Sequence, residues 1–199
     1  MTTPSDFPAP AEAPVSFLWA QVESPVIEDY VEVPAGADVK QFTLPDGATM
    51  TVVSSKADSA TLLAADALAP GTSRIINSGT TTTLIAAPRA TCSQSSSVSD
   101  PILRTAVQRN VYSSFSYTRS SGCEWGQTWY ANLIAPDPIW GYNTSAQQSE
   151  TVTKPGYTDS VYMSYICKGS ATKKWHANTQ PYNGTPFAES VRKNLACSR

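Results

Sequence analysis

"YMSYICKGSATKKWHANTQ", residues 162–180, contains two runs of alternating residues separated by Gly169. In a β-strand, successive side chains point to opposite faces of the sheet. Before the glycine, one face carries the residues Val161, Met163, Tyr165 and Cys167. Beyond it, one face carries Ala171, Lys173, Trp175 and Ala177, and the other carries Thr172, Lys174, His176 and Asn178. The pattern predicts two strands with a turn at Gly169, Trp175 in the core and His176 facing water.

Similar short runs recur along the chain and predict an all-β fold. Residues 39–55 (VKQFTLPDGATMTVVSS) and 73–87 (SRIINSGTTTTLIAA) predict two hairpins, which turn at 45–47 and 77–79. Further strands are predicted over 127–138, 149–169 and 172–184. Only 15% of the residues are charged, which together with many Ser, Thr and Pro residues is typical of an extracellular β-protein. We expect an antiparallel β-sandwich preceded by a smaller β-meander region.

Three segments allow a helix. Residues 59–69 (SATLLAADALA) favour one, although their apolar positions are continuous rather than periodic. Asp100 and Pro101 can open a short helix as N-cap and first residue, with a strand over 106–120 as the alternative. The last segment, 189–197, is either a helix or a strand that brings Cys197 back to Cys167, and we favour the strand.

Composition divides the chain into three expected segments. Residues 1–14 are rich in Pro, Ala and acidic residues and predict a disordered leader. Residues 1–90 carry ten acidic and four basic residues, a net charge of −6, whereas 91–199 carry six and ten, a net charge of +4. We expect an acidic β-region over 15–90 and a disulfide-stapled β-sandwich domain over 91–199. The charge difference reflects either drift in composition or docking of an acidic half on a basic half, in which case 15–90 is a pro-region or cover.

The cysteines indicate disulfides. They are Cys92, Cys123, Cys167 and Cys197, an even number without C-x-x-C spacing. Four cysteines permit three connectivities, with free buried cysteines as a further alternative. We favour Cys92–Cys123 and Cys167–Cys197, because each closes a loop of about thirty residues and stabilises the fold by roughly 3–4 kcal/mol.

Disulfides require an oxidising compartment. Residues 1–14 lack the charged n-region of a signal peptide, and the apolar run that follows them is too short for an h-region. The chain contains no stretch of apolar residues long enough to span a membrane as a helix. We expect a secreted, mature chain to which a start methionine was added. The net charge of −2 does not indicate a nucleic-acid partner.

Most catalytic chemistries lack their motifs. His176 is the single histidine, and no G-x-S-x-G sequence supports a Ser-His-Asp hydrolase. One histidine and widely spaced cysteines do not predict a zinc site, and no Gly-rich phosphate loop occurs. We expect no metal and no cofactor. Glu124 and Asp137 flank an aromatic-rich region and are candidates for a glycosidase pair, with solvated surface acids as the alternative.

The unusual feature is a cluster of aromatic residues between positions 123 and 143. It contains the candidate ligand-binding residues Trp125, Trp129, Tyr130, Trp140 and Tyr142. Aromatic rings provide large apolar contact areas with a polar tip, which suits ligand platforms and interfaces. On a strand Trp129 and Tyr130 point to opposite faces, so one can lie in the core while the other is exposed. Filling of the core by these rings is the alternative.

Residues 91–199 resemble small secreted, disulfide-stapled β-sandwich proteins of actinobacteria. The features that carry the resemblance are SYTRSSGC at 116–123, YICKGSAT at 165–172 and the final Cys197. The resemblance implies a secreted sandwich and no assigned activity. The layout is also similar to the proteinaceous α-amylase inhibitors, which have two consecutive disulfides and an aromatic-Arg-aromatic surface triplet. Here Tyr117 and Arg119 are not part of such an adjacent triplet.

These observations favour a secreted, non-catalytic binding protein. Its expected partner is an extracellular polysaccharide or protein, bound by the aromatic residues of 125–142 and nearby basic residues. Inhibition of a secreted hydrolase and a glycosidase-type activity are the alternatives. The sequence does not fix the oligomeric state.

Overall fold

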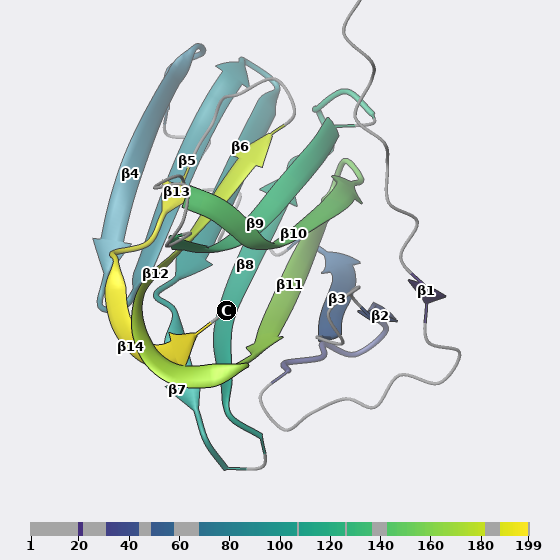
Figure 1. Ribbon diagram of the computed structural model, residues 1–199. Helices are drawn as coiled ribbons and strands as arrows, with labels where there is room; N and C mark the ends of the chain where they lie inside the picture. The colour runs from purple at the N-terminus through teal and green to yellow at the C-terminus, as the bar shows by residue number, and fades with distance from the viewer. Residues whose placement is uncertain are drawn as a thin grey trace, which may run out of the picture.

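The computed structural model describes residues 20–21, 31–43, 49–57, 68–106, 108–125, 127–136, 143–181 and 188–198. These residues form two antiparallel sheets that pack as a β-sandwich (Figure 1). The prediction of an all-β, disulfide-stapled antiparallel sandwich is confirmed. The described ranges contain no helix that is long and apolar enough to cross a membrane.

The larger sheet has the strand order β1-β2-β3-β11-β8-β6-β5-β4, with β7 paired to β8. Its strands are β1 (Ala20–Gln21), β2 (Asp38–Thr43), β3 (Thr49–Lys56), β4 (Thr72–Ser78), β5 (Thr81–Arg89), β6 (Cys92–Ser99), β7 (Ile102–Arg104), β8 (Asn110–Arg119) and β11 (Tyr157–Ile166). Along β11, Val161 and Met163 face the core as predicted, whereas Ser160 and Tyr162 are only partly buried on the outer face.

The smaller sheet has the order β10-β9-β12-β13, with β14 also paired to β12. Its strands are β9 (Gln127–Pro136), β10 (Asn143–Thr153), β12 (Gly169–Pro181), β13 (Ala188–Glu189) and β14 (Lys193–Ser198). In Figure 1 these strands lie across one face of the larger sheet. The outer face of the smaller sheet, pointing away from the core, is therefore a surface separate from the outer face of the larger one.

The predicted turn at Gly169 carries the chain from one layer to the other. The strand before it, β11, lies between β3 and β8 in the larger sheet, whereas β12 pairs with β9 in the smaller sheet. A Cβ atom at Gly169 would meet the hydroxyl of Ser198 on β14, which would then have to rotate away. The chain also changes sheets at 154–156, where Gly156 adopts a φ of 79°.

Two pairs of aromatic side chains join the sheets across the core. The ring centroids of Tyr117 on β8 and Trp129 on β9 are 5.0 Å apart, and those of Tyr165 on β11 and Trp175 on β12 are 5.2 Å apart. All four side chains are essentially inaccessible to solvent. The prediction that Trp175 lies in the core is confirmed, and its indole N–H donates to the carbonyl oxygen of Cys197 at 3.0 Å.

The disulfides are those favoured from spacing, Cys92–Cys123 and Cys167–Cys197. Both predicted hairpins form, as β2–β3 and β4–β5, although positions 45–47 lie outside the described residues. The second hairpin turns at Gly79, whose φ is 58°, and the residue after it, because Ser78 already pairs with Thr81.

Of the three segments that allow a helix, the structure describes the one after Asp100 and the one over 189–197. Both form strands, so the strand alternative is correct for each. Residues after Asp100 form β7 and β8, and the C-terminal segment contains β13 and β14. Asp100 does not cap a helix. Its carboxylate accepts a hydrogen bond from the backbone N–H of Val191 at 3.1 Å and pairs with Lys193 at 3.3 Å. Most of 59–69 and all of the leader 1–14 lie outside the described residues.

The segments 15–90 and 91–199 share one sheet where they are described. The first segment contributes β1 to β5, of which β3 pairs with β11 and β5 pairs with β6. The described strands of 15–90 are thus hydrogen-bonded to strands of 91–199. A role of 15–90 as a pro-region or cover stays a prediction.

Candidate binding surface

Trp125 is the most exposed large apolar side chain of the described residues, with 68% of its surface accessible. It lies in the loop that connects β8 to β9. An exposed tryptophan offers a large apolar area to a ligand or partner. The sequence analysis selected Trp125 as a candidate, and the structure places it at the surface rather than in the core.

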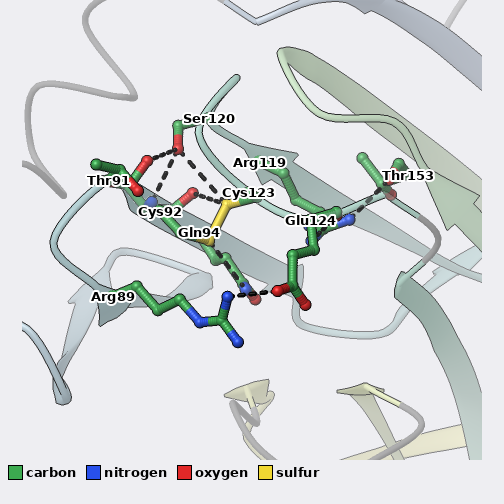
Figure 2. Close-up of a disulfide and its surroundings, with 10 residues drawn as sticks. Arg89, Thr91, Cys92, Gln94, Arg119, Ser120, Cys123, Glu124 and Thr153 are labelled. Atoms are coloured by element: carbon green, nitrogen blue, oxygen red, sulfur yellow. Dashed lines mark hydrogen bonds and ion pairs between the residues drawn. A yellow bond between two sulfur atoms is a disulfide. The ribbon is translucent and has the colours of Figure 1, made fainter.

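The loop before Trp125 is held by a disulfide and by serine contacts (Figure 2). Cys123 is bonded to Cys92 at the start of β6. The hydroxyl of Ser120 accepts a hydrogen bond from the backbone N–H of Ser93 at 2.9 Å, and the Ser120 N–H donates to the Ser93 carbonyl at 2.9 Å. The loop is therefore fixed to β6 at both ends of its tight turn.

Two arginines hold the residue that precedes Trp125. Arg119, which is only 3% exposed, donates to the carbonyl oxygens of Glu124 at 2.5 Å and Thr153 at 3.2 Å. Arg89 forms an exposed ion pair with the Glu124 carboxylate (Figure 2). Because the Glu124 backbone and side chain are both engaged, the backbone that leads into Trp125 is held before any ligand binds.

The structure separates the neighbours Trp129 and Tyr130, as strand alternation predicted. Trp129 is completely buried, so the part of the prediction that made it a ligand-binding residue is wrong. Tyr130 is half-buried on the outer face of the smaller sheet. The other two candidates, Trp140 and Tyr142, lie outside the described residues.

Tyr130 lies beside a group of amide side chains on this outer face. Its direct partner on β12 is Gln180, and the next outward position on β9, Asn132, pairs with Asn178. The side-chain amide of Asn132 donates to the Asn178 side-chain oxygen at 2.9 Å. We call Trp125, Tyr130, Asn132, Asn178 and Gln180 the candidate surface. The amides were missed as site residues, although the alternation of 172–178 placed Asn178 on the outer face.

Further exposed groups surround the start of β9. Val152, opposite Thr128 on β10, is 48% exposed and extends the apolar area on the outer face. Lys154 lies after β10 and contacts the ring of Tyr157 at 5.8 Å. Together with Arg89, it supplies positive charge at the end of the sandwich where the sequence predicted basic neighbours of the aromatics.

The prediction that His176 faces water is wrong. Its side chain is on the outer face, but only 4% of the residue is exposed, and its Nε2 lies 3.7 Å from the Glu189 carboxylate. Burial lowers the pKa of His176, Arg192 lowers this pKa further, and Glu189 partly opposes both. The alternation placed His176 on the correct face of the sheet. The charged neighbours of His176, Glu189 and Arg192, come from the later segment that pairs with β12 through β13.

The described residues do not assemble a hydrolytic centre. No serine hydroxyl hydrogen-bonds His176 there, and no group of three metal-ligating side chains is present in the described ranges. Glu124 pairs with Arg89, and its proposed partner Asp137 lies outside these ranges. Tyr117 and Arg119 are both buried, so neither can contact an enzyme surface in the manner of an exposed inhibitor triplet.

No protein-family model matches the chain, and a search of curated proteins finds no match to it. The candidate surface is therefore argued from its own geometry.

Proposed function

We propose that the protein is a secreted, non-catalytic binding protein that holds an extracellular polysaccharide on the candidate surface. The observation that carries the proposal is Trp125, which is 68% exposed on a loop fixed by a disulfide and by Arg119. An indole ring has only two rotatable side-chain bonds, so it loses little conformational entropy when a sugar ring stacks on it.

The polar part of the surface supports a sugar ligand. Asn132, Asn178 and Gln180 carry amides, each of which can donate to and accept from hydroxyl groups. They lie on neighbouring strands about 4.8 Å apart, and β9 rises by about 3.3 Å per residue, so the contact is extended along the sheet. An extended polar row on β9 and β12, with an exposed ring in the loop that leads into β9, suits a chain of sugar units better than a compact ligand.

The proposed location follows from the cysteines. All four are in disulfides, which persist in oxidising compartments outside the cytosol. A polysaccharide of a cell wall or an extracellular matrix is available in that compartment.

The test is co-sedimentation with insoluble chitin, cellulose and bacterial cell-wall material, in parallel with a reducing-end assay. We expect retention of the wild type on at least one polymer without release of sugar. Trp125→Ala should abolish most of the retention. Ile75→Ala is the matched control, because Ile75 is 58% exposed on β4 at the edge of the larger sheet and should not contribute.

Other outcomes identify the alternatives. No retention of the wild type on any polymer contradicts the proposal and makes a protein partner the next candidate, tested by titration against secreted hydrolases. Release of reducing ends that Glu124→Gln abolishes would instead support a glycosidase. Equal loss in the Trp125 and Ile75 variants would show that retention is a general apolar effect.

A further inference from the structure

The outer face of the larger sheet contains a cavity of about 260 Å³, on the opposite side of the sandwich from the candidate surface. Five serines from three neighbouring strands line it. One row is formed by Ser97, Ser116 and Ser160, which are direct partners across β6, β8 and β11. Next to it lies Ser114, whose backbone N–H donates to the hydroxyl of Ser99 at 2.9 Å. The floor of the cavity is therefore a grid of hydroxyl groups on a rigid sheet.

Several of these hydroxyls are available to a ligand. Among the residues that the structure describes, the Oγ atoms of Ser97, Ser114 and Ser116 have no hydrogen-bond partner. Each hydroxyl can donate one hydrogen bond and accept two. They stand on neighbouring strands, so their spacing is about 4.8 Å across the sheet.

Two tyrosines and one carboxylate form the wall of the cavity. The rings of Tyr112 and Tyr162 are stacked with centroids 6.4 Å apart. The backbone of Glu32 lies beside the hydroxyl of Tyr162, and this exposed residue lines the rim. Burial raises the pKa of Tyr162, so its hydroxyl stays protonated at neutral pH.

The charges select the ligand. The carboxylate of Glu32 repels anions, and it can accept two hydrogen bonds from neighbouring hydroxyl groups. The guanidinium of Arg104 lies 3.7 Å from the centre of the Tyr112 ring, outside the residues that line the cavity, so Glu32 is the one charged group among those lining residues. A ligand that carries many hydroxyl groups and no negative charge suits this lining. The volume is slightly below the range of about 300–1,000 Å³ that holds drug-sized ligands, which indicates a small one.

We propose that this cavity binds a single neutral sugar unit, with Ser97, Ser114, Ser116 and Glu32 bonding its hydroxyls and the tyrosine wall contacting its apolar face. The site is independent of the candidate surface, because the two lie on opposite faces of the sandwich and share no residue.

The experiment is a titration followed by NMR chemical shifts, with the methyl glycosides of glucose, galactose and mannose and with N-acetylglucosamine as neutral probes. Glucuronate and glucosamine are the charged comparisons. At least one neutral probe should give saturable shifts with a Kd of about 1 mM, as expected of a small open site. Glucuronate should bind at least about tenfold more weakly, since Glu32 repels its carboxylate, whereas glucosamine, whose ammonium group Glu32 attracts, should bind no more weakly than the neutral sugars.

Two variants and two controls assign the site. Ser116→Leu fills the cavity, and Glu32→Gln removes the charged acceptor from an exposed position. Each should weaken binding by about tenfold or more, because Ser116→Leu takes up the space of the sugar and Glu32→Gln removes a strong hydrogen-bond acceptor. Ser55→Leu makes a matched change on the same face of the sheet but outside the cavity, and Trp125→Ala alters only the candidate surface. Both controls should bind like the wild type.

The proposal is overturned if none of the four neutral probes gives saturable shifts, if glucuronate binds as tightly as the neutral sugars, or if the two cavity variants bind normally. Loss of binding in Trp125→Ala with normal binding in folded Ser116→Leu would move the sugar site to the candidate surface. Loss of polymer retention with sugar binding intact would refute only the function proposed above.

Discussion

The guanidinium of Arg119 donates a hydrogen bond to the carbonyl oxygen of Glu124 at 2.5 Å, one residue before the exposed Trp125. Burial lowers the pKa of Arg119, whereas the neighbouring Glu124 raises it. A buried guanidinium is costly unless its donors are used. This one uses two of its nitrogens to hold backbone carbonyls of the β8–β9 loop and of β10. It thereby links the loop to the smaller sheet.

Replacement of Arg119 by Met should loosen this loop. The carbonyl oxygens of Glu124 and Thr153 would lose their donors, and the unpaired acceptor of the buried Thr153 costs about 1–3 kcal/mol. We expect a lower free energy of unfolding in urea and a weaker near-ultraviolet circular dichroism signal. Arg89→Met is the control, because the exposed ion pair with Glu124 contributes only about 0–1 kcal/mol. Equal stability of the two variants would contradict this account.

The two disulfides should contribute similar stability. They join cysteines 31 and 30 residues apart, so the chain-entropy model assigns each about 3–4 kcal/mol. Replacement of Cys92 and Cys123 by Ala should therefore lower the free energy of unfolding by about as much as replacement of Cys167 and Cys197. Urea denaturation of the two double variants measures both values. A loss under about 1 kcal/mol for either pair would rule out the entropic explanation for that bridge.

Trp175→Phe should destabilise the protein through one lost donor. The indole N–H of Trp175 bonds the Cys197 carbonyl at 3.0 Å, and phenylalanine leaves that buried oxygen unpaired. The expected cost is about 1–3 kcal/mol, with an added contribution from the smaller ring volume. Thermal and urea unfolding test it. A variant as stable as the wild type would mean that another donor satisfies the carbonyl.

His176 should make stability fall on acidification. Burial lowers the pKa of His176 below its ordinary value of 6.5, so the unfolded chain binds the proton more tightly than the folded protein. The stabilising contribution is complete above pH 6.5 and is lost as the pH falls from 6.5 through the lower folded-state pKa. Urea unfolding of wild type and His176→Gln over this window isolates the effect. The variant should show a shallower decline, and parallel curves would contradict the assignment.

Asp159 should make stability rise, rather than fall, on acidification. Burial raises the pKa of Asp159 above 3.8, and the hydrogen bond from Ser54 only partly opposes the rise. Its stabilising contribution is therefore present below pH 3.8 and is lost as the pH rises through the folded-state pKa. Asp159→Asn removes the charge and keeps an acceptor for Ser54. We expect it to be at least as stable as the wild type at neutral pH in urea denaturation, and a clear loss there would refute the explanation.

Local patterns in the sequence were sufficient to predict the strands, the two hairpins and the two disulfides. Alternation over 162–180 located two strands and assigned Trp175 to the core, because the side-chain period of a strand is a property of the backbone. Hairpin signals and cysteine spacing depend on short or fixed separations, and both were confirmed in β2–β3, β4–β5 and the two disulfides.

The tertiary structure decided which strands meet. The pairing of β3 with β11 joins residues about a hundred positions apart, and no local pattern distinguishes that partner from other strands of similar alternation. Local patterns also do not predict whether a side chain on the outer face of a sheet is buried. His176 lies in a polar row, yet the later segment around Glu189 covers it, whereas Trp125 stays exposed because Arg119 and a disulfide hold its loop outside the core. Alternation is set within one strand, but exposure depends on what the rest of the chain packs against it, and only the folded structure contains that information.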